Sequence, residues 1–245
     1  MTKEQERILG NVERVFLPIL KQVFEENLIA VILYGSAVKG MFTKGVSDVN
    51  VLIILRDADP AAVVALGGRG KSVLRKNRIT PLLLTEKEYL GSADIFPLEY
   101  LDILASRKVL HGIDPTPDLK ITQSNLRHQV EAQLRGTIGA LRSALLASRG
   151  KSSILRRYLK DWFGSQNALI RGLLRLGGIE SIPDDIQSIS KVLGEQFGID
   201  SGSLIQLARI RTGEKIDAAQ TVEGVLIYLT RVVEKVDNMD ESHDE

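Results

Sequence analysis

Two short polar motifs interrupt the apolar first third of the sequence, and their residue types suit phosphate and metal binding. Gly35-Ser36 ends the apolar run AVILY, and Asp48-Val49-Asn50 opens the next one. Glycine permits a tight turn and a close backbone approach to a ligand. A helix that begins at such a turn offers backbone N–H groups to a phosphate, and the Ser36 hydroxyl adds a donor. We therefore predict that Gly35 and Ser36 hold phosphates.

The second motif places two oxygen-bearing side chains on alternate positions. Alternate residues of a strand share a face, so Asp48 and Asn50 are expected to point the same way. Mg²⁺ takes oxygen ligands and is usually held by one or two carboxylates together with substrate phosphates. Asp48 and Asn50 are therefore the predicted metal ligands. A plainer interpretation also fits, in which Ser47-Asp48 satisfies backbone groups in a turn at the start of a strand.

Basic residues near these motifs have two interpretations as well. Lys39 and Lys44 lie between the motifs and are candidate phosphate contacts, although ordinary surface lysines are the simpler interpretation. The run RGKSVLRKNRI, residues 69–79, reads as a solvated helix face or as a phosphate or nucleic-acid contact. Aromatic residues make up 5% of the chain, so no stacking surface for single-stranded nucleic acid is evident.

The elements that must position these residues alternate between helix and strand in the first half. Amphipathic spacing and short β-branched runs predict helices at 3–27 and 60–76 and strands at 30–34, 49–55, 79–85 and 96–104. Pro81 marks its strand as an edge strand or a strand start. Strands that alternate with helices, followed by neighbouring strands without a long crossover, predict a mixed sheet in an α/β (α+β) domain.

The second half has only helical patterns. The segment HGIDPTPDL, residues 111–119, predicts a linker. The helices expected after it are 122–148, 152–176, 184–197, 203–211 and 221–237. Short connections between such helices favour an antiparallel bundle. We predict an α/β domain over 1–115, a helical bundle over 116–238 and an acidic, disordered tail over 239–245.

Composition excludes several classes of protein. Hydrophobic residues make up 44% of the 245 residues and charged residues 26%, as in ordinary globular proteins. A formal net charge of +1 gives no global attraction to nucleic acid or membranes. The absence of cysteine excludes disulfides and thiolate metal sites. With no signal-peptide pattern and no run long enough for a membrane span, we expect a cytoplasmic protein.

The motifs Leu33-Tyr34-Gly35-Ser36 and Asp48-Val49-Asn50-Val51, in this order and spacing, resemble the DNA polymerase β-like nucleotidyltransferase superfamily. The likeness is greatest to its bacterial branch of aminoglycoside and other small-molecule nucleotidyltransferases, and it covers about residues 28 to 112. In that branch a helical bundle follows the catalytic domain. The resemblance implies a nucleotidyltransferase-like fold for the α/β domain.

The resemblance also implies a reaction. In the family, Mg²⁺ held by strand carboxylates grips a nucleoside triphosphate, and an acceptor hydroxyl attacks the α-phosphorus and expels pyrophosphate. Carried over, Asp48 is the shared metal ligand and the Gly35-Ser36 turn holds the β- and γ-phosphates. The expected activity is transfer of a nucleoside monophosphate, AMP by preference, from a nucleoside triphosphate to a hydroxyl of a small molecule or protein.

Two positions depart from the family pattern. Asn50 stands where the family has its second carboxylate, and residues 79–85 hold no acid where the third is usual. An amide oxygen can ligate a hard cation but supplies no charge. A second interpretation is therefore open, in which a catalytically degenerate relative, a pseudoenzyme, binds a nucleotide or a partner protein without turnover.

Three acids remain as candidates for the third carboxylate, namely Glu86, Glu99 and Asp102. On a strand, residues three positions apart point to opposite faces, so at most one of Glu99 and Asp102 would face the site. We place Glu99 in the catalytic set because its face alternates with Leu101 and Ile103. The acceptor, the nucleobase and the oligomeric state, a homodimer included, stay open.

Overall fold

The computed structural model describes residues 3–39, 48–164, 166–179, 181–183 and 185–239. The chain divides into two compact units, Met1–Ile121 and Thr122–Glu245. All but the first residue of the predicted tail, 239–245, lies outside the described residues. Among the helices that the structure describes, none is both long and apolar enough to cross a membrane.

A four-stranded mixed sheet forms the centre of the first unit. Its strands are β1 (Leu28–Tyr34), β2 (Val49–Leu55), β3 (Ile79–Thr85) and β4 (Arg107–Gly112), in the order β3-β2-β1-β4. β1 is antiparallel to both β2 and β4, whereas β2 and β3 run parallel. The predicted mixed sheet is confirmed, and the strands predicted at 49–55 and 79–85 have the observed bounds.

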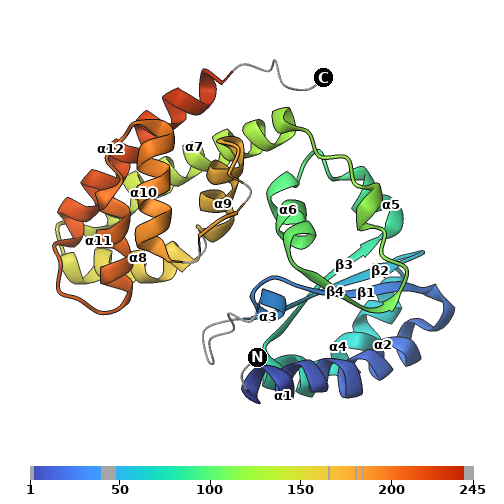
Figure 1. Ribbon diagram of the computed structural model, residues 1–245. Helices are drawn as coiled ribbons and strands as arrows, with labels where there is room; N and C mark the ends of the chain where they lie inside the picture. Colours follow the sequence, from blue (N-terminus) through green and yellow to red (C-terminus); the bar gives the residue numbers. More distant parts are fainter. Residues whose placement is uncertain (1–2, 40–47, 165, 180, 184, 240–245) are drawn as a thin grey trace. The chain divides into compact units, whose positions relative to one another are not determined.

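Helices cover both faces of this sheet (Figure 1). One face packs against α1 (Lys3–Asn11), a π-helical turn (Val12–Phe16), α2 (Leu17–Phe24) and α4 (Pro60–Asn77). The other face packs against α5 (Glu86–Gly91) and α6 (Pro97–Ala105). The central strands are therefore apolar on both sides, because Ile53 is buried under the first group of helices and Leu52 under the second.

Two predictions in this unit are wrong. The segment 96–104 is not a strand, because Pro97 opens α6 and Leu98 and Ile103 are buried at helical spacing. The fourth strand is β4, and its last two residues fall in the predicted linker at 111–119. All side chains of β4 are half-buried or exposed, because β4 lies at an edge of the sheet. Its sequence therefore has no apolar run that would mark it as a strand.

The second unit consists of helices: α7 (Gln123–Ser148), α8 (Ser152–Gly164), α9 (Asn167–Leu176), α10 (Ile186–Phe197), α11 (Gly202–Arg211) and α12 (Ala218–Asp237). The single helix predicted over 152–176 is two helices, and the first ends at Gly164, a weak helix former. The apolar face of α12, including Val225 and Val232, is buried as its spacing predicts.

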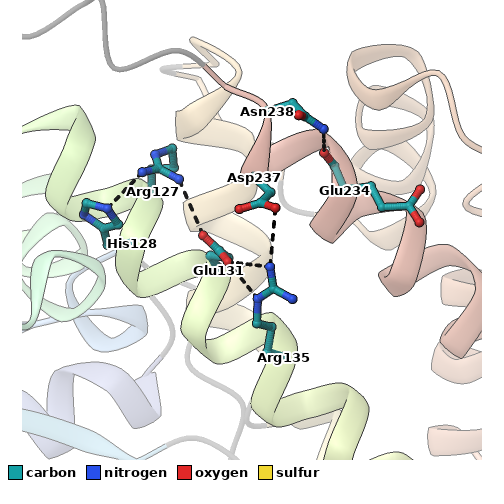
Figure 2. Close-up of polar contacts among 7 residues, drawn as sticks. All are labelled: Arg127, His128, Glu131, Arg135, Glu234, Asp237 and Asn238. Atoms are coloured by element: carbon teal, nitrogen blue, oxygen red, sulfur yellow. Dashed lines mark hydrogen bonds and ion pairs between the residues drawn. The ribbon is translucent and has the colours of Figure 1, made fainter.

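Charged side chains join the first turns of α7 to the last turn of α12. Figure 2 shows Glu131 between two arginines, with Arg127 at 3.5 Å and Arg135 at 2.7 Å. Arg135 also lies 3.6 Å from Asp237 of α12. The Arg127 guanidinium donates to Nε2 of His128 at 2.9 Å, so that nitrogen is the acceptor. These contacts connect α7 with α12, two helices that are far apart in the sequence.

Candidate functional site

One end of the sheet carries a row of four polar residues. Tyr34 at the end of β1 pairs with Asn50 on β2 and with Arg107 on β4, and Asn50 pairs with Thr80 on β3. Residues that pair directly across strands point to the same face. Tyr34 packs in the apolar cluster beneath α5 and α6, so the row faces those helices.

The Gly35 turn lies next to Asn50. Gly35 has φ +79°, in the left-handed region that favours glycine, and an added Cβ would lie 3.2 Å from Nδ2 of Asn50. The Gly35 N–H donates to the Ser106 carbonyl at 3.0 Å, and its own carbonyl accepts from Val38 N–H at 3.0 Å. The two motifs of the sequence analysis therefore meet at one end of the sheet.

The helix after the turn is short. The helix α3 spans only Ser36–Lys39, so its aligned peptide dipoles sum to little. Ser36 is half-buried. Lys44 and the Lys39 side chain lie outside the described residues. Their predicted phosphate contacts stay predictions.

Asp48 is paired with an arginine. The Arg78 guanidinium contacts one carboxylate oxygen of Asp48 twice, from Nε and from Nη2, each at 2.9 Å. The pair is accessible, since 45% of the Arg78 side chain and 51% of the Asp48 side chain are exposed. Their chain segments are also joined, because Val49 N–H donates to the Arg78 carbonyl at 2.9 Å.

Two carboxylates of α6 act on the tyrosine of the row. Burial, and after it the negative charges of Glu99 and Asp102, raise the pKa of Tyr34 to about 12. The phenol therefore stays protonated at neutral pH and can donate a hydrogen bond. The reason for expecting only one of the two acids at the site, opposite faces of a strand, does not apply to them. They lie on a helix, where residues three positions apart share a face.

The third candidate acid is remote from this end of the sheet. Glu86 begins α5, directly after the far end of β3. Because β2 and β3 run parallel, Glu86 is separated from the start of β2 by the length of a seven-residue strand, roughly 20 Å. Tyr34 was not predicted as a site residue, and Arg78 was predicted only as one member of the basic run at 69–79. The signals were a tyrosine before the glycine turn and an arginine directly before a strand.

The two predicted metal ligands provide one carboxylate between them. Asp48 is paired with Arg78, and Asn50 carries no charge. Thr80 lies beside Asn50 on β3, so the neighbouring strand adds a hydroxyl rather than an acid. Across the residues described, no group of three or more His, Cys, Asp or Glu side chains is placed to hold a metal ion.

Comparison with known proteins gives a structural likeness but no sequence match. No family model matches the chain, and no curated protein sequence matches it. Among solved structures, a spectinomycin adenyltransferase from Enterococcus faecialis, determined with ATP and spectinomycin, matches with a TM-score of 0.61. The two chains are 15% identical, and the match covers 97% of this chain and 100% of the other. The likeness therefore shows a nucleotidyltransferase-like fold and no more.

Proposed function

We propose that the first unit binds a nucleoside triphosphate at the end of the sheet that carries the Gly35 turn. The observation that carries this proposal is the 3.2 Å approach between Asn50 Nδ2 and the position of a Cβ on Gly35. This approach brings the Gly-Ser turn and the Asp-x-Asn strand together. A bound triphosphate would lie against the Gly35 backbone and the Ser36 hydroxyl, close to Asn50. ATP is the expected nucleotide, because the adenyltransferase of similar fold was determined with ATP.

A second candidate function is transfer of AMP from ATP to an acceptor hydroxyl, and the pair of acids on α6 favours it. The acceptor oxygen would bond to the α-phosphorus as the bond to pyrophosphate breaks. The hydroxyl proton would pass to a carboxylate, for which Glu99 and Asp102 are the candidates near the row. The structural likeness supports a small molecule as acceptor, since the similar enzyme was determined with spectinomycin.

Nucleotide binding is tested first. The protein is melted with ATP, GTP, CTP or UTP, each with Mg²⁺ and with EDTA. A ligand at a hundred times its dissociation constant stabilises the folded state by about 2.7 kcal/mol. We expect ATP to raise the melting temperature and Asp48→Ala to reduce that shift. No shift with any nucleotide would refute the proposal.

Transfer is tested separately by pyrophosphate release from ATP in the presence of spectinomycin as a trial acceptor. Glu99→Gln and Asp102→Gln are compared with Glu86→Gln, which changes an acid at the far end of the sheet. Loss of release in a variant of α6, with Glu86→Gln unaffected, supports transfer. Nucleotide binding without pyrophosphate release would leave the protein a nucleotide-binding relative of the transferases.

A further inference from the structure

We infer that Ser106 is a positioning residue, which holds the Gly35 turn in the conformation proposed to bind the nucleotide. This inference rests on the proposed function and concerns the same end of the sheet. Ser106 is the residue that ends α6, and it directly precedes β4. Its side chain is buried, since only 8% of the residue is exposed.

Ser106 lies opposite Gly35 where β1 and β4 pair. Tyr34 pairs with Arg107 in these antiparallel strands, so the next pair along them is Gly35 with Ser106. In a hydrogen-bonded antiparallel pair, the two residues exchange both of their N–H···O=C bonds. Here the Gly35 N–H donates to the Ser106 carbonyl at 3.0 Å, which is the first of these bonds.

The hydroxyl of Ser106 takes the place of the second bond, because the Ser106 N–H is used elsewhere. No residue other than Ser106 separates α6 from β4, so Ser106 also terminates the helix, and its N–H donates to the Ile103 carbonyl at 3.2 Å. The hydroxyl donates to the Gly35 carbonyl at 3.3 Å. A serine at this position thus serves the helix and the strand at once, whereas an alanine would lack the donor to Gly35.

The conformation of the turn depends on such bonds. Glycine adopts left-handed and right-handed backbone conformations with similar ease, so the residue type alone does not fix φ at +79°. Ser106 is the partner in two hydrogen bonds of Gly35, and Val38 of the four-residue helix α3 supplies another. A site that is correctly formed for only part of the time binds its ligand with an affinity lowered by that fraction. The Ser106 hydroxyl therefore supports affinity by keeping the turn in one conformation.

Ser106 also links the turn to the helix that carries Glu99 and Asp102. The negative charges of these acids act on Tyr34, the residue before Gly35. A side chain that joins the end of α6 to Gly35 fixes where this helix ends relative to the turn. The proposed site therefore depends on Ser106 through the conformation of the turn and through the end of α6.

The test compares the ATP affinity of three variants of the full chain by calorimetric titration with Mg²⁺. Ser106→Ala removes the hydroxyl, and Ser106→Thr keeps it on a β-branched residue that suits the extended backbone there. Ser148→Ala is the matched control in the second unit, because Ser148 is also buried and its hydroxyl also donates to a backbone carbonyl, that of Leu145. We expect Ser106→Ala to weaken ATP binding roughly threefold to tenfold, as the loss of one hydrogen bond would. Ser106→Thr and Ser148→Ala should stay within about twofold of the wild type.

Hydrogen exchange gives a second readout, which does not depend on ATP. The Gly35 N–H should exchange faster in Ser106→Ala than in the wild type, because its pair with Ser106 opens more readily. Melting curves without ATP control for folding.

The outcomes separate this inference from the proposed function. Wild-type ATP affinity in Ser106→Ala, or unchanged exchange at Gly35, would overturn the inference while the proposed function stands. So would a Ser106→Thr variant that melts like the wild type but binds ATP like Ser106→Ala. No ATP binding by the wild type would overturn the proposed function itself, and exchange at Gly35 would then decide whether Ser106 holds the turn.

Discussion

Substituting Gly35 by alanine separates two effects of the Gly35 turn, backbone strain and contact with Asn50. At φ +79° the left-handed conformation costs an L-residue about 1–2 kcal/mol. The added methyl would also lie 3.2 Å from Asn50 Nδ2, so the amide must move by a few tenths of an ångström. For a chain of this size, 1 kcal/mol corresponds to about 2–4 °C in melting temperature. We expect Gly35→Ala to lower the melting temperature by about 2–8 °C.

Gly150→Ala is the matched control for the backbone effect. Gly150 has φ +74°, and a Cβ there would meet nothing within 4 Å. This variant should lose a similar amount of stability, by calorimetry, with no effect on the Gly35 turn. We expect the ATP-dependent melting shift to fall in Gly35→Ala and to be unchanged in Gly150→Ala. Equal shifts in the two variants would refute the argument that the approach of Gly35 to Asn50 forms the nucleotide site.

Three further predictions concern the same unit. In Gly112→Ala, a Cβ would lie 1.7 Å from the carbonyl oxygen of Ile29, so we expect a loss above about 3 kcal/mol in chemical denaturation, larger than for Gly35→Ala. The pKa of Tyr34 is raised to about 12, so its contribution to stability is present below about pH 10 and lost as the pH rises to 12. The free energy of unfolding should therefore fall by about 2–3 kcal/mol more in the wild type than in Tyr34→Phe over this range, and parallel curves would contradict this. Asn50→Asp adds a second carboxylate beside the turn, so we expect its ATP affinity to rise when Mg²⁺ replaces EDTA, and a titration indifferent to Mg²⁺ would count against this view.

Much of the first unit could be predicted from its sequence, because its central strands are short apolar runs between polar turns. The strands 49–55 and 79–85 were located to the residue, since both carry continuous apolar side chains that end at charged or polar positions. The strand β4 could not be recognised in the same way. An edge strand needs only backbone hydrogen bonds to β1 and buries little of its side chains, so RKVLHG resembles a loop.

The site was predicted incompletely because residues 96–104 were assigned the two-residue period of a strand instead of the period of a helix. FPLEYLDIL has apolar residues that fit both a strand and a helix, and a short apolar run does not distinguish them. As a strand it would present Glu99 or Asp102, whereas on α6 the negative charges of both act on Tyr34. The ion pair between Asp48 and Arg78 was also beyond the sequence, because it depends on the parallel pairing of β2 with β3.

The two outer strands of the sheet have a consequence for self-association. An open strand edge offers unpaired N–H and C=O groups to another chain and promotes aggregation. Pro81 removes one N–H from the outer edge of β3, as its position in the sequence predicted. On the opposite edge, β4 carries a break in register against β1 and the exposed Lys108, both of which oppose edge-to-edge pairing. Both edges of the sheet thus carry a feature that opposes the addition of a strand from another chain.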